Sequence, residues 1–330
     1  MKVLVVGGAG YIGSHTVRQL SRKGHGVRIL DNLSTGHRSL VKGHELLVGD
    51  IHDQRMLRDA LRGVDAVIHF AAHACVGESV MHPRKYFANN VQGALHLLNG
   101  VLDAGVQMLI FSSSCAVYGV PSRVPITEDE ACRPVNPYGA TKLFFEQALG
   151  AYHRAYGLRS VSLRYFNAAG ADEDGDLGEL HDPETHLLPC ILRAAAGLQD
   201  SLEIYGGDYP TADGTCIRDF VHVSDLADAH VLALDYLAAG GECEVLNLGT
   251  GSGHSVRQIV SLAERITGRQ IPHRVCERRP GDPPVLTADP SRARAILKWQ
   301  ARFAIDEIVA SAWRWQSREH AAAARSATAD

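Results

Sequence analysis

Residues 3–13 of the chain read Val-Leu-Val-Val-Gly-Gly-Ala-Gly-Tyr-Ile-Gly, so an apolar run leads directly into Gly7, Gly10 and Gly13. The run predicts a buried parallel strand, and the apolar spacing over residues 12–23 predicts a helix after it. Glycines let the backbone turn tightly and approach a pyrophosphate, which the free N–H groups at a helix start can bind. The strand–turn–helix order therefore predicts a dinucleotide-binding turn.

An acidic residue follows where such a turn requires one. Asp31 ends the second predicted strand, about 20 residues after the turn, where a carboxylate binds a ribose 2′-hydroxyl. A carboxylate there would repel a 2′-phosphate, which favours NAD over NADP. The alternative is a purely structural turn followed by a solvated aspartate. Asp50, after the third strand, is predicted near the adenine, and residues 70–72 end the fourth strand at the ligand-binding edge.

Strands and helices alternate over the first half of the chain. Predicted strands cover residues 2–6, 26–30, 45–48, 66–70, 108–112 and 159–164, and predicted helices cover 12–23, 54–61, 83–104 and 137–156. This pattern predicts an α/β fold with a Rossmann-type doubly wound parallel sheet. We expect a NAD-binding domain over residues 1–170, completed by about 219–250. Residues 171–330 would form a smaller C-terminal α/β lobe with long loops, and its tail at 317–330 would be disordered.

Tyr138 and Lys142 form a candidate acid–base pair. They lie four residues apart, and therefore on one face of the predicted helix at 137–156. A nearby ammonium, the dipole of the helix start and an oxidised nicotinamide together favour the phenolate, so we expect the pKa of Tyr138 to be lowered toward neutral pH. The hydroxyl run Ser112-Ser113-Ser114 ends the fifth strand at the same edge and could share the proton. The alternatives are a surface helix and a solvated turn or helix cap.

Composition excludes several classes of function. A net charge of −4 implies no general attraction to nucleic acid or to an anionic membrane, and no apolar run is long enough to span a bilayer. The seven cysteines are scattered without a Cys-x-x-Cys pair. We therefore expect reduced thiols, no signal peptide and a cytoplasmic protein.

Further segments accompany these residues: Asp31-Asn32-Leu33, Ser112 to Gly119, Arg164 to Asn167, His181 to Leu187, Asp208 to Thr211, Asp213 to Asp219 and Arg278 to Asp282. Together with the glycine turn and residues 137–142, they make the chain resemble the extended short-chain dehydrogenase/reductase family over nearly its whole length. Within that family it is most similar to the UDP-glucose (UDP-galactose) 4-epimerases. Its Tyr-Pro-Thr and Asp-Gly-Thr-x-x-Arg-Asp segments are specific to nucleotide-sugar epimerases.

The resemblance implies reversible C4 epimerisation of UDP-galactose and UDP-glucose, with transient hydride transfer to bound NAD through a 4-keto sugar. Tyr138 would take the proton of the 4-hydroxyl, Ser114 would bridge the two oxygens, and Lys142 would hold the nicotinamide ribose. The alternatives are a 4-epimerase of UDP-pentoses or UDP-N-acetylhexosamines, a nucleotide-sugar dehydratase and a non-catalytic NAD sensor. A dehydratase would carry Asp-Glu where this chain has Cys115-Ala116, and a sensor would not need the catalytic residues.

The resemblance also implies the binding residues. Those expected to contact NAD are Gly7, Gly10, Tyr11, Ile12, Gly13, Asp31, Asn32, Asp50, Ile51, Phe70, Ala71, Ala72, Asn89, Ser112, Tyr138, Lys142 and Tyr165. Those expected to contact the UDP-sugar are Ser114, Tyr138, Asn167, His186, Leu187, Arg218, Arg279 and Asp282. Arginine forks suit the diphosphate. A homodimer is expected through the outer faces of the helices predicted at 83–104 and 137–156.

Two positions depart from the family. A lysine that contacts the cofactor in some members is replaced by Ala74, for which His73 is the candidate substitute. Leu286 falls on the gate of the sugar pocket, where its intermediate size leaves the preferred sugar open.

The run His181-Asp182-Pro183-Glu184-Thr185-His186 has the residue types of a metal site. Pro183 breaks any helix that would align the ligands, and no His-Glu-x-x-His motif is present. We therefore expect no metal here, and a loop that covers the sugar site.

Overall fold

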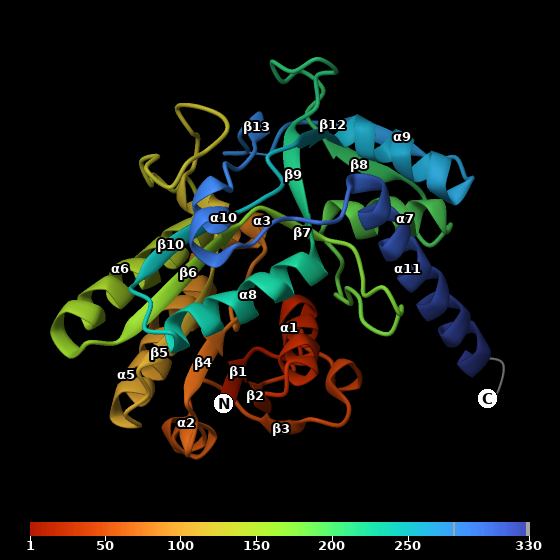
Figure 1. Ribbon diagram of the computed structural model, residues 1–330. Coiled ribbons are helices and arrows are strands. Elements are labelled where there is room, and N and C mark those ends of the chain that lie inside the picture. Colours follow the sequence, from red (N-terminus) through yellow and green to blue (C-terminus); the bar gives the residue numbers. More distant parts are fainter. Residues whose placement is uncertain (280, 328–330) are drawn as a thin grey trace.

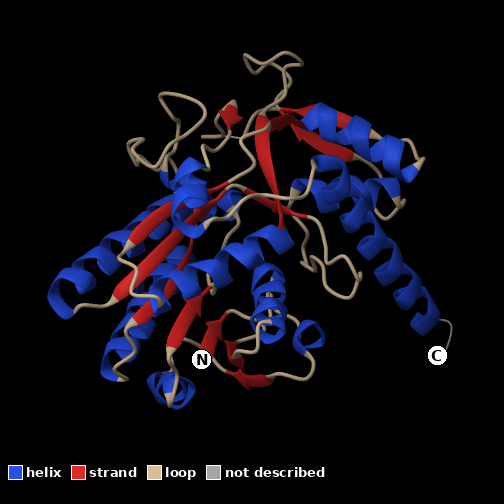
Figure 2. Cartoon of the chain, in the orientation of Figure 1, coloured by secondary structure: helices blue, strands red, loops and turns tan. Residues whose placement is uncertain are grey.

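The computed structural model describes residues 1–279 and 281–327 and contains a seven-stranded parallel sheet (Figures 1 and 2). The strand order is β10-β6-β5-β4-β1-β2-β3. The strands are β1 (Lys2–Val6), β2 (Gly26–Asp31), β3 (Glu45–Val48), β4 (Ala66–His69), β5 (Met108–Ser114), β6 (Arg159–Tyr165) and β10 (Glu244–Leu248). The predicted doubly wound parallel fold is confirmed.

Helices cover both faces of this sheet (Figure 1). They are α1 (Tyr11–Arg22) and α8 (Val223–Ala238) on one face, and α2 (Gln54–Leu61), α5 (Ala94–Asp103) and α6 (Pro137–Tyr156) on the other. Each face has its own apolar core: Leu20 and Leu234 belong to the first, and Leu97 and Phe145 to the second. Each such fully buried side chain contributes about 1.5–3 kcal/mol.

The order of the strands reverses between β1 and β4, because β2 follows β1 to one side and β5 follows β4 to the other. In open α/β sheets the carboxyl ends of the strands at such a reversal leave a crevice for ligands. The glycine turn follows β1 and the hydroxyl run ends β5, so both predicted motifs lie at this edge.

α6 begins and ends where its sequence specifies. The Asn136 side chain caps the N-terminus by accepting a bond of 2.8 Å from the Gly139 N–H, and Pro137 occupies the first turn. Gly157, with a φ of 74°, ends the helix in the left-handed conformation. These signals place Tyr138 in the first turn of α6, next to the end of β5.

The second lobe is built on two small sheets. β7 (Asn167–Ala169), β9 (Ile217–His222), β11 (Gly253–Ser255) and β13 (Val285–Leu286) form one, and β8 (Leu202–Tyr205) and β12 (His273–Cys276) form the other. Its helices are α7 (Leu187–Ala195), α9 (Val256–Thr267) and α11 (Ile305–Ala327), while α10 (Ser291–Leu297) contacts β10 and α8 of the first lobe. Residues 219–250 contribute α8 and β10 to the large sheet layer, although β9 belongs to the second lobe. Among the described residues, no helix combines the length and the apolar character needed to cross a membrane.

The helix predicted over 83–104 is divided. α4 (Pro83–Phe87) passes through a π-helical turn, η2 (Ala88–Gly93), into α5. The buried Asn90 side chain in this turn bonds both the N–H and the C=O of His73, at 2.9 Å each. The wider turn lets a helix residue bond the segment after β4, an interaction between distant segments that the helical pattern does not predict. A further short helix, α3 (Val76–Met81), precedes α4.

The prediction of a disordered tail over 317–330 is wrong as far as Ala327, because α11 continues to that residue. Alanine has the highest helix propensity, and the tail contains the run 321–324. Arg318 also anchors the helix by donating a bond of 2.8 Å to the Asp174 carbonyl. Residues 328–330 lie outside the described residues.

Candidate active site at the sheet edge

The three glycines of the turn after β1 are needed for different structural reasons. Gly7 has a φ of +81°, and a Cβ there would lie 2.5 Å from the Ala71 nitrogen. A Cβ on Gly13 would lie 2.3 Å from the Gly7 carbonyl oxygen. A Cβ on Gly10 would meet only that oxygen, at 3.4 Å. Gly7 and Gly13 are thus required by the protein's own packing, whereas Gly10 keeps the approach to the turn open.

The start of α1 fits a phosphate group. Gly10 is its N-cap residue, and no side chain caps the helix. The first-turn N–H groups therefore have no intrahelical acceptor and can bind an anion. Tyr11 is buried and donates a bond of 2.6 Å to the Gly170 carbonyl, while Ile12 packs against the apolar core. Tyr11 thus fixes this turn to the start of the loop that leads into the second lobe.

Asp31 is held by the backbone around it. Its two carboxylate oxygens accept the N–H groups of Ala9 and Leu33, both at 2.8 Å. Burial raises the pKa of the carboxyl, and these two hydrogen bonds oppose the shift. Each oxygen retains a lone pair, so the fixed carboxylate can still accept a ribose hydroxyl.

Asn32 and Asp50, both predicted to contact NAD, are hydrogen-bonded to each other. The Asn32 amide donates a bond of 2.7 Å to Asp50, whose other oxygen accepts the His52 N–H at 2.9 Å. Burial acts to raise the pKa of Asp50, but the hydrogen bonds from His52 and Asn32 outweigh it and lower the pKa. The Ile51 side chain belongs to the apolar core, so only its backbone is available to a ligand.

The segment after β4 forms the opposite side of the turn. Ala71 and Ala72 are half-buried, and Phe70 is half-buried with its ring 4.6 Å from the His230 ring. The Asn89 amide donates a bond of 2.9 Å to the Asn90 side chain. These alanines leave room beside the glycine turn, which fits a cofactor lying between β1 and β4.

His73 does not replace the positive charge that Ala74 lacks. Burial lowers the pKa of His73 from its usual 6.5, and the nearby Lys85 lowers it further. The imidazole is therefore neutral at pH 7. Its backbone is engaged by Asn90, so its role in this structure is to fix the chain after β4.

The candidate catalytic side chains converge at the ends of β5 and β6. Lys142 donates a bond of 2.7 Å to the Ser112 carbonyl, and its ammonium nitrogen lies 5.7 Å from the centre of the Tyr138 ring. The Ser112 hydroxyl contacts the Tyr165 hydroxyl. Ser114, Tyr138 and Lys142 are each less than a tenth exposed. The sequence predicted this group, and the structure brings it together.

The protein's own groups do not lower the pKa of Tyr138. Burial raises the pKa of Tyr138 well above 10, Tyr165 adds to the rise, and a hydrogen bond with Ser114 opposes it. Burial also lowers the pKa of Lys142 to about 7, against the opposing charge of Glu146. Lys142 and the helix end do not by themselves outweigh the loss of solvent, so a lowered pKa would have to come from the oxidised nicotinamide that the expectation also included.

Part of the predicted substrate group is assembled around β9. Arg218 forms an ion pair with Asp282 at 2.5 Å, and the Arg279 guanidinium lies 4.0 Å from the centre of the Tyr205 ring. Leu286 on β13 pairs with Arg218 and packs with Cys115 and the other buried residues of its cluster. Burial raises the pKa of Cys115 to about 12, and the nearby Arg218 opposes this rise. Arg218 therefore lies close to the residue that follows Ser114.

The three other predicted substrate residues lie at or next to the start of a strand or helix. Asn167 is half-buried at the start of β7, and Leu187 is the first residue of α7. His186 precedes α7 and contacts Glu179 through Nδ1.

The sequence profile of the NAD-dependent epimerase/dehydratase family matches residues 3–249. This chain belongs to that family. The family membership confirms the predicted NAD dependence, and the resemblance inferred from the motifs is confirmed with it.

The similarity extends to whole proteins. A UDP-glucose 4-epimerase of Rhizobium meliloti (strain 1021) is 49% identical over 320 residues, which are 96% of this chain and 98% of the relative. The crystal structure of UDP-glucose 4-epimerase from Brucella ovis in complex with NAD has a TM-score of 0.92 and 53% identity, over 95% of this chain and 98% of that one. The enzyme from Bifidobacterium longum in complex with NAD⁺ and UDP has a TM-score of 0.93 and 40% identity, over 97% and 99% of the two chains.

One buried pair in this family member was missed by the sequence analysis. Glu146 and Arg164 form a two-bond ion pair, at 2.9 and 2.5 Å, and Ser113 donates a bond of 2.5 Å to the same carboxylate. Glu146 lies four residues after Lys142, so the helical spacing that joins Tyr138 to Lys142 could have identified it. The pair ties α6 to β6 and thereby fixes the helix that carries the catalytic residues.

The loop over residues 179–186 also differs from expectation. It is not helical, as predicted, yet it brings Glu179, His181, Glu184 and His186 together, with one donor atom of each within 4.8 Å of the others. Burial acts to raise the pKa of Glu179, but His186 and His181 outweigh it and hold the pKa at about 2. A folded loop can bring the four side chains together without a helix, so the helix-breaking Pro183 does not exclude a metal here.

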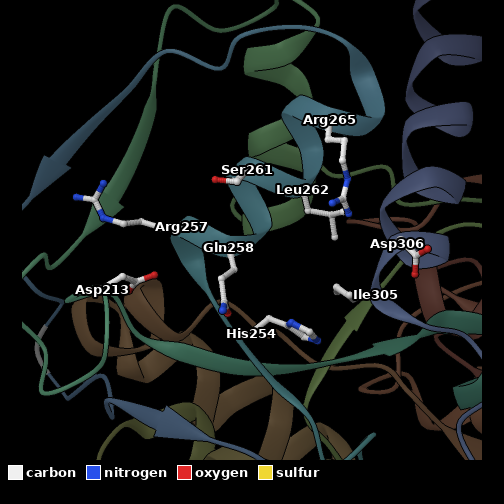
Figure 3. A pocket seen from close by; sticks show the side chains of 9 residues that line it. All are labelled: Asp213, His254, Arg257, Gln258, Ser261, Leu262, Arg265, Ile305 and Asp306. Carbon is white, nitrogen blue, oxygen red and sulfur yellow. The ribbon is translucent and has the colours of Figure 1, made fainter.

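A separate depression of 520 Å³ lies between α9 and the start of α11 (Figure 3). Its lining residues are Asp213, His254, Arg257, Gln258, Ser261, Leu262, Arg265, Ile305 and Asp306. None of the predicted catalytic or binding residues lines it. The candidate catalytic and binding residues therefore lie apart from this depression.

Proposed function

We propose that this family member interconverts UDP-galactose and UDP-glucose by inverting C4 of the sugar while NAD remains bound. The observation that carries the proposal is the buried convergence of Ser114, Tyr138 and Lys142 at the edge that also holds the glycine turn. A protein that only sensed NAD would not need a hydroxyl, a phenol and an amine together there.

The cofactor would lie across the reversal of strand order. The free N–H groups at the start of α1 would bind its pyrophosphate, Asp31 would accept a ribose hydroxyl, and Asn32 with Asp50 would face the adenosine. Residues 70–72 and Asn89 would border it on the β4 side. Lys142 would hold the nicotinamide ribose, supported by Ser112 and Tyr165.

The protein's own groups would handle the proton of the reaction. The Tyr138 phenolate would take the proton of the sugar 4-hydroxyl, with Ser114 bonded to both oxygens. When bound, NAD would supply an oxidised nicotinamide, the hydride acceptor and donor that inversion at C4 requires. The pKa of Lys142 is about 7, and the protonated form of Lys142 would stabilise the Tyr138 phenolate. Turning of the sugar within the pocket would expose that second face.

The second lobe would bind the nucleotide part of the substrate. Arg218 and Arg279 would contact the diphosphate and Asp282 the uridine ribose, because guanidinium forks match phosphate oxygens. Asn167 would bond the sugar, and His186 and Leu187 would contact the nucleotide at the start of α7. We accordingly assign NAD binding to residues 1–170 with 219–250, and UDP-sugar binding to the rest of 171–330.

We also propose a homodimer located in the cytoplasm. Phe87 and Phe144 on the outer side of α4 and α6 are 46% and 42% exposed, which is unusual for large aromatic side chains and suits a second copy. The seven cysteines, all free, agree with a reducing compartment. A monomeric mass in sedimentation or light scattering at micromolar concentration would contradict the dimer.

The function is tested by incubating the purified protein with UDP-galactose and no added NAD. We expect UDP-glucose to form, and NAD to be released when the protein is denatured. Bound NAD without conversion would keep the cofactor assignment and reject the hexose, and UDP-pentoses and UDP-N-acetylhexosamines would then be assayed. Neither conversion nor bound NAD, even after NAD is supplied, would contradict the proposal.

A further inference from the structure

We propose that Glu179, His181, Glu184 and His186 form a binding site for one divalent transition-metal ion, with Zn²⁺ the ion that the ligand set suits best. The four side chains come from one folded loop and the residue before α7. Metal binding can be measured whether or not the protein epimerises a sugar, because Ser114, Tyr138 and Lys142 are not among the ligands, although His186 is also the residue proposed above to contact the nucleotide.

The spacing of the donor atoms fits tetrahedral coordination. His181 Nδ1 lies 3.2 Å from a Glu179 oxygen and 3.8 Å from a Glu184 oxygen, and His186 Nδ1 contacts the same Glu179 oxygen. Zinc bonds of about 2.0–2.1 Å in a tetrahedron place neighbouring ligand atoms about 3.3 Å apart. The separations lie on both sides of this value, and no two of the four donor atoms are more than 4.8 Å apart, so a local rearrangement of the loop would bring them around one ion.

The chemistry of the donors selects the class of ion. Two imidazole nitrogens and two carboxylate oxygens suit zinc and its first-row neighbours, whereas magnesium and calcium prefer oxygen alone. A metal binds neutral imidazole, so ion binding would release the protons of the two histidines and leave the four side chains with two negative charges. A divalent ion neutralises these charges.

Burial and anchoring make the site a built one. The Glu179 and Glu184 side chains are each only 6% exposed. One Glu184 oxygen also accepts the backbone N–H groups of Thr185 and His186, at 2.7 and 2.8 Å, which fixes the carboxylate. Hydrogen bonds that orient ligands in this way are typical of metal sites.

The position of the site suggests what a bound ion does. The Trp315 indole donates a bond of 3.0 Å to the Glu179 carbonyl, and the His37 ring contacts the Leu180 carbonyl at 3.2 Å. Burial raises the pKa of Tyr11 at the start of α1, and the nearby charges of Glu179 and Glu184 add to this rise. A metal ion here would fasten the loop beside α7, which His186 precedes, and α11, whose Trp315 bonds the loop, so we assign it a structural role.

The alternative is a set of ion pairs between the histidines and the glutamates, with no affinity for metal. Titrating the chelator-treated, full-length protein with Co²⁺ separates the two, because tetrahedral cobalt with nitrogen and oxygen ligands gives intense visible bands. We expect one equivalent of Co²⁺ to bind with such bands and to be displaced by one equivalent of Zn²⁺. No visible bands, or bands with the low intensity of octahedral cobalt, would overturn the proposal.

Variants locate the ion. His181→Gln should lose the bands and lower the Zn²⁺ affinity by at least about 100-fold, a loss seen even for groups that only support ligands. The matched control is His273→Gln, which changes an exposed histidine on β12 and should leave both unchanged. In wild type, Zn²⁺ should also raise the unfolding temperature, with no rise in His181→Gln. Full cobalt binding by His181→Gln, or its loss in His273→Gln, would reject this assignment.

Discussion

Two groups of titratable side chains in this protein differ in what determines their pKa values. At the catalytic edge, burial lowers the pKa of Lys142 to about 7 and raises that of Tyr138. In the loop that contains Glu179 and His181, burial likewise favours the neutral form of each side chain. Direct pairing of carboxylates with imidazoles outweighs it, holds the pKa of Glu179 at about 2 and raises that of His181 to about 10. Burial determines the first result and pairing the second.

The difference lies in what contacts the charge. Lys142 bonds a neutral carbonyl, and the nearest carboxylate on its own helix, Glu146, is engaged by Arg164. In the loop, carboxylates and imidazoles contact one another directly. The catalytic edge thus holds groups whose charge depends on what binds there, as proton transfer requires. Without an ion, the carboxylates and imidazoles of the loop pair with one another, and a divalent ion would replace the imidazole protons.

The largest expected effect comes from removing the group that carries the proton. Tyr138→Phe should lower kcat for UDP-galactose by 10³- to 10⁴-fold, the upper range for general acid–base catalysis, about 10²–10⁴-fold. Initial rates should be measured beside NAD content and circular dichroism. Both should match wild type, because the hydrogen bond of the phenol with Ser114 lies within the site and joins no elements of the fold. A rate within 10-fold of wild type, about 1.4 kcal/mol of barrier, would remove Tyr138 from the mechanism.

The next largest effect concerns the pair that fixes α6. Glu146→Gln leaves the buried Arg164 guanidinium without its counter-charge and should lower the free energy of unfolding by about 3–5 kcal/mol. Urea unfolding measures this loss. The matched control is Glu146→Leu with Arg164→Met, which removes both charges and should recover most of the stability. Equal instability in both proteins would show that packing, and not charge, holds this position.

The Lys142 pKa predicts a pH dependence of stability. Between the folded value of about 7 and the usual value of 10.5, the unfolded chain binds a proton that the folded chain does not. The free energy of unfolding should therefore rise with pH across this window, by on the order of 1 kcal/mol per pH unit. Lys142→Met should lack this rise. Unfolding of NAD-free protein at pH 7, 8.5 and 10 tests it, and parallel curves for the two proteins would contradict the lowered pKa.

The smallest effect concerns the turn itself. Gly13→Ala places a methyl group against the Gly7 carbonyl, which should cost about 1–3 kcal/mol of stability and release bound NAD. Gly77→Ala in α3 is the matched control, because its methyl group meets nothing within 4 Å. It should change stability by at most about 0.5 kcal/mol. Retention of NAD by Gly13→Ala would show that the turn relaxes more readily than its packing indicates.

The fold was predictable because its signals are local. The apolar run before Gly7, the Asn136 cap and the spacing of Tyr138 and Lys142 each depend on a few neighbouring residues. The parallel sheet followed from the alternation of such segments. The prediction of a disordered tail failed because alanine-rich sequence was interpreted from its composition alone, without its helix propensity.

The remaining features depend on contacts between distant residues. The Glu146–Arg164 pair joins α6 to β6, and the Asn90 side chain bonds the chain 17 residues earlier. Direct pairing in the loop over 179–186 likewise requires its folded path. The rise that burial causes in the pKa of Tyr138 was not predicted, because burial is a property of the whole fold, which the sequence pattern at Tyr138 does not contain.

The central claim is that the hydride leaves C4 and returns to the same carbon within one buried site. It is tested most directly with UDP-galactose carrying deuterium at C4, converted in ordinary water and analysed by NMR of the UDP-glucose formed. The account predicts that the product keeps the deuterium at C4 and that none reaches the solvent. Loss of the label to water would contradict it, because the C4 hydrogen would then have left as a proton.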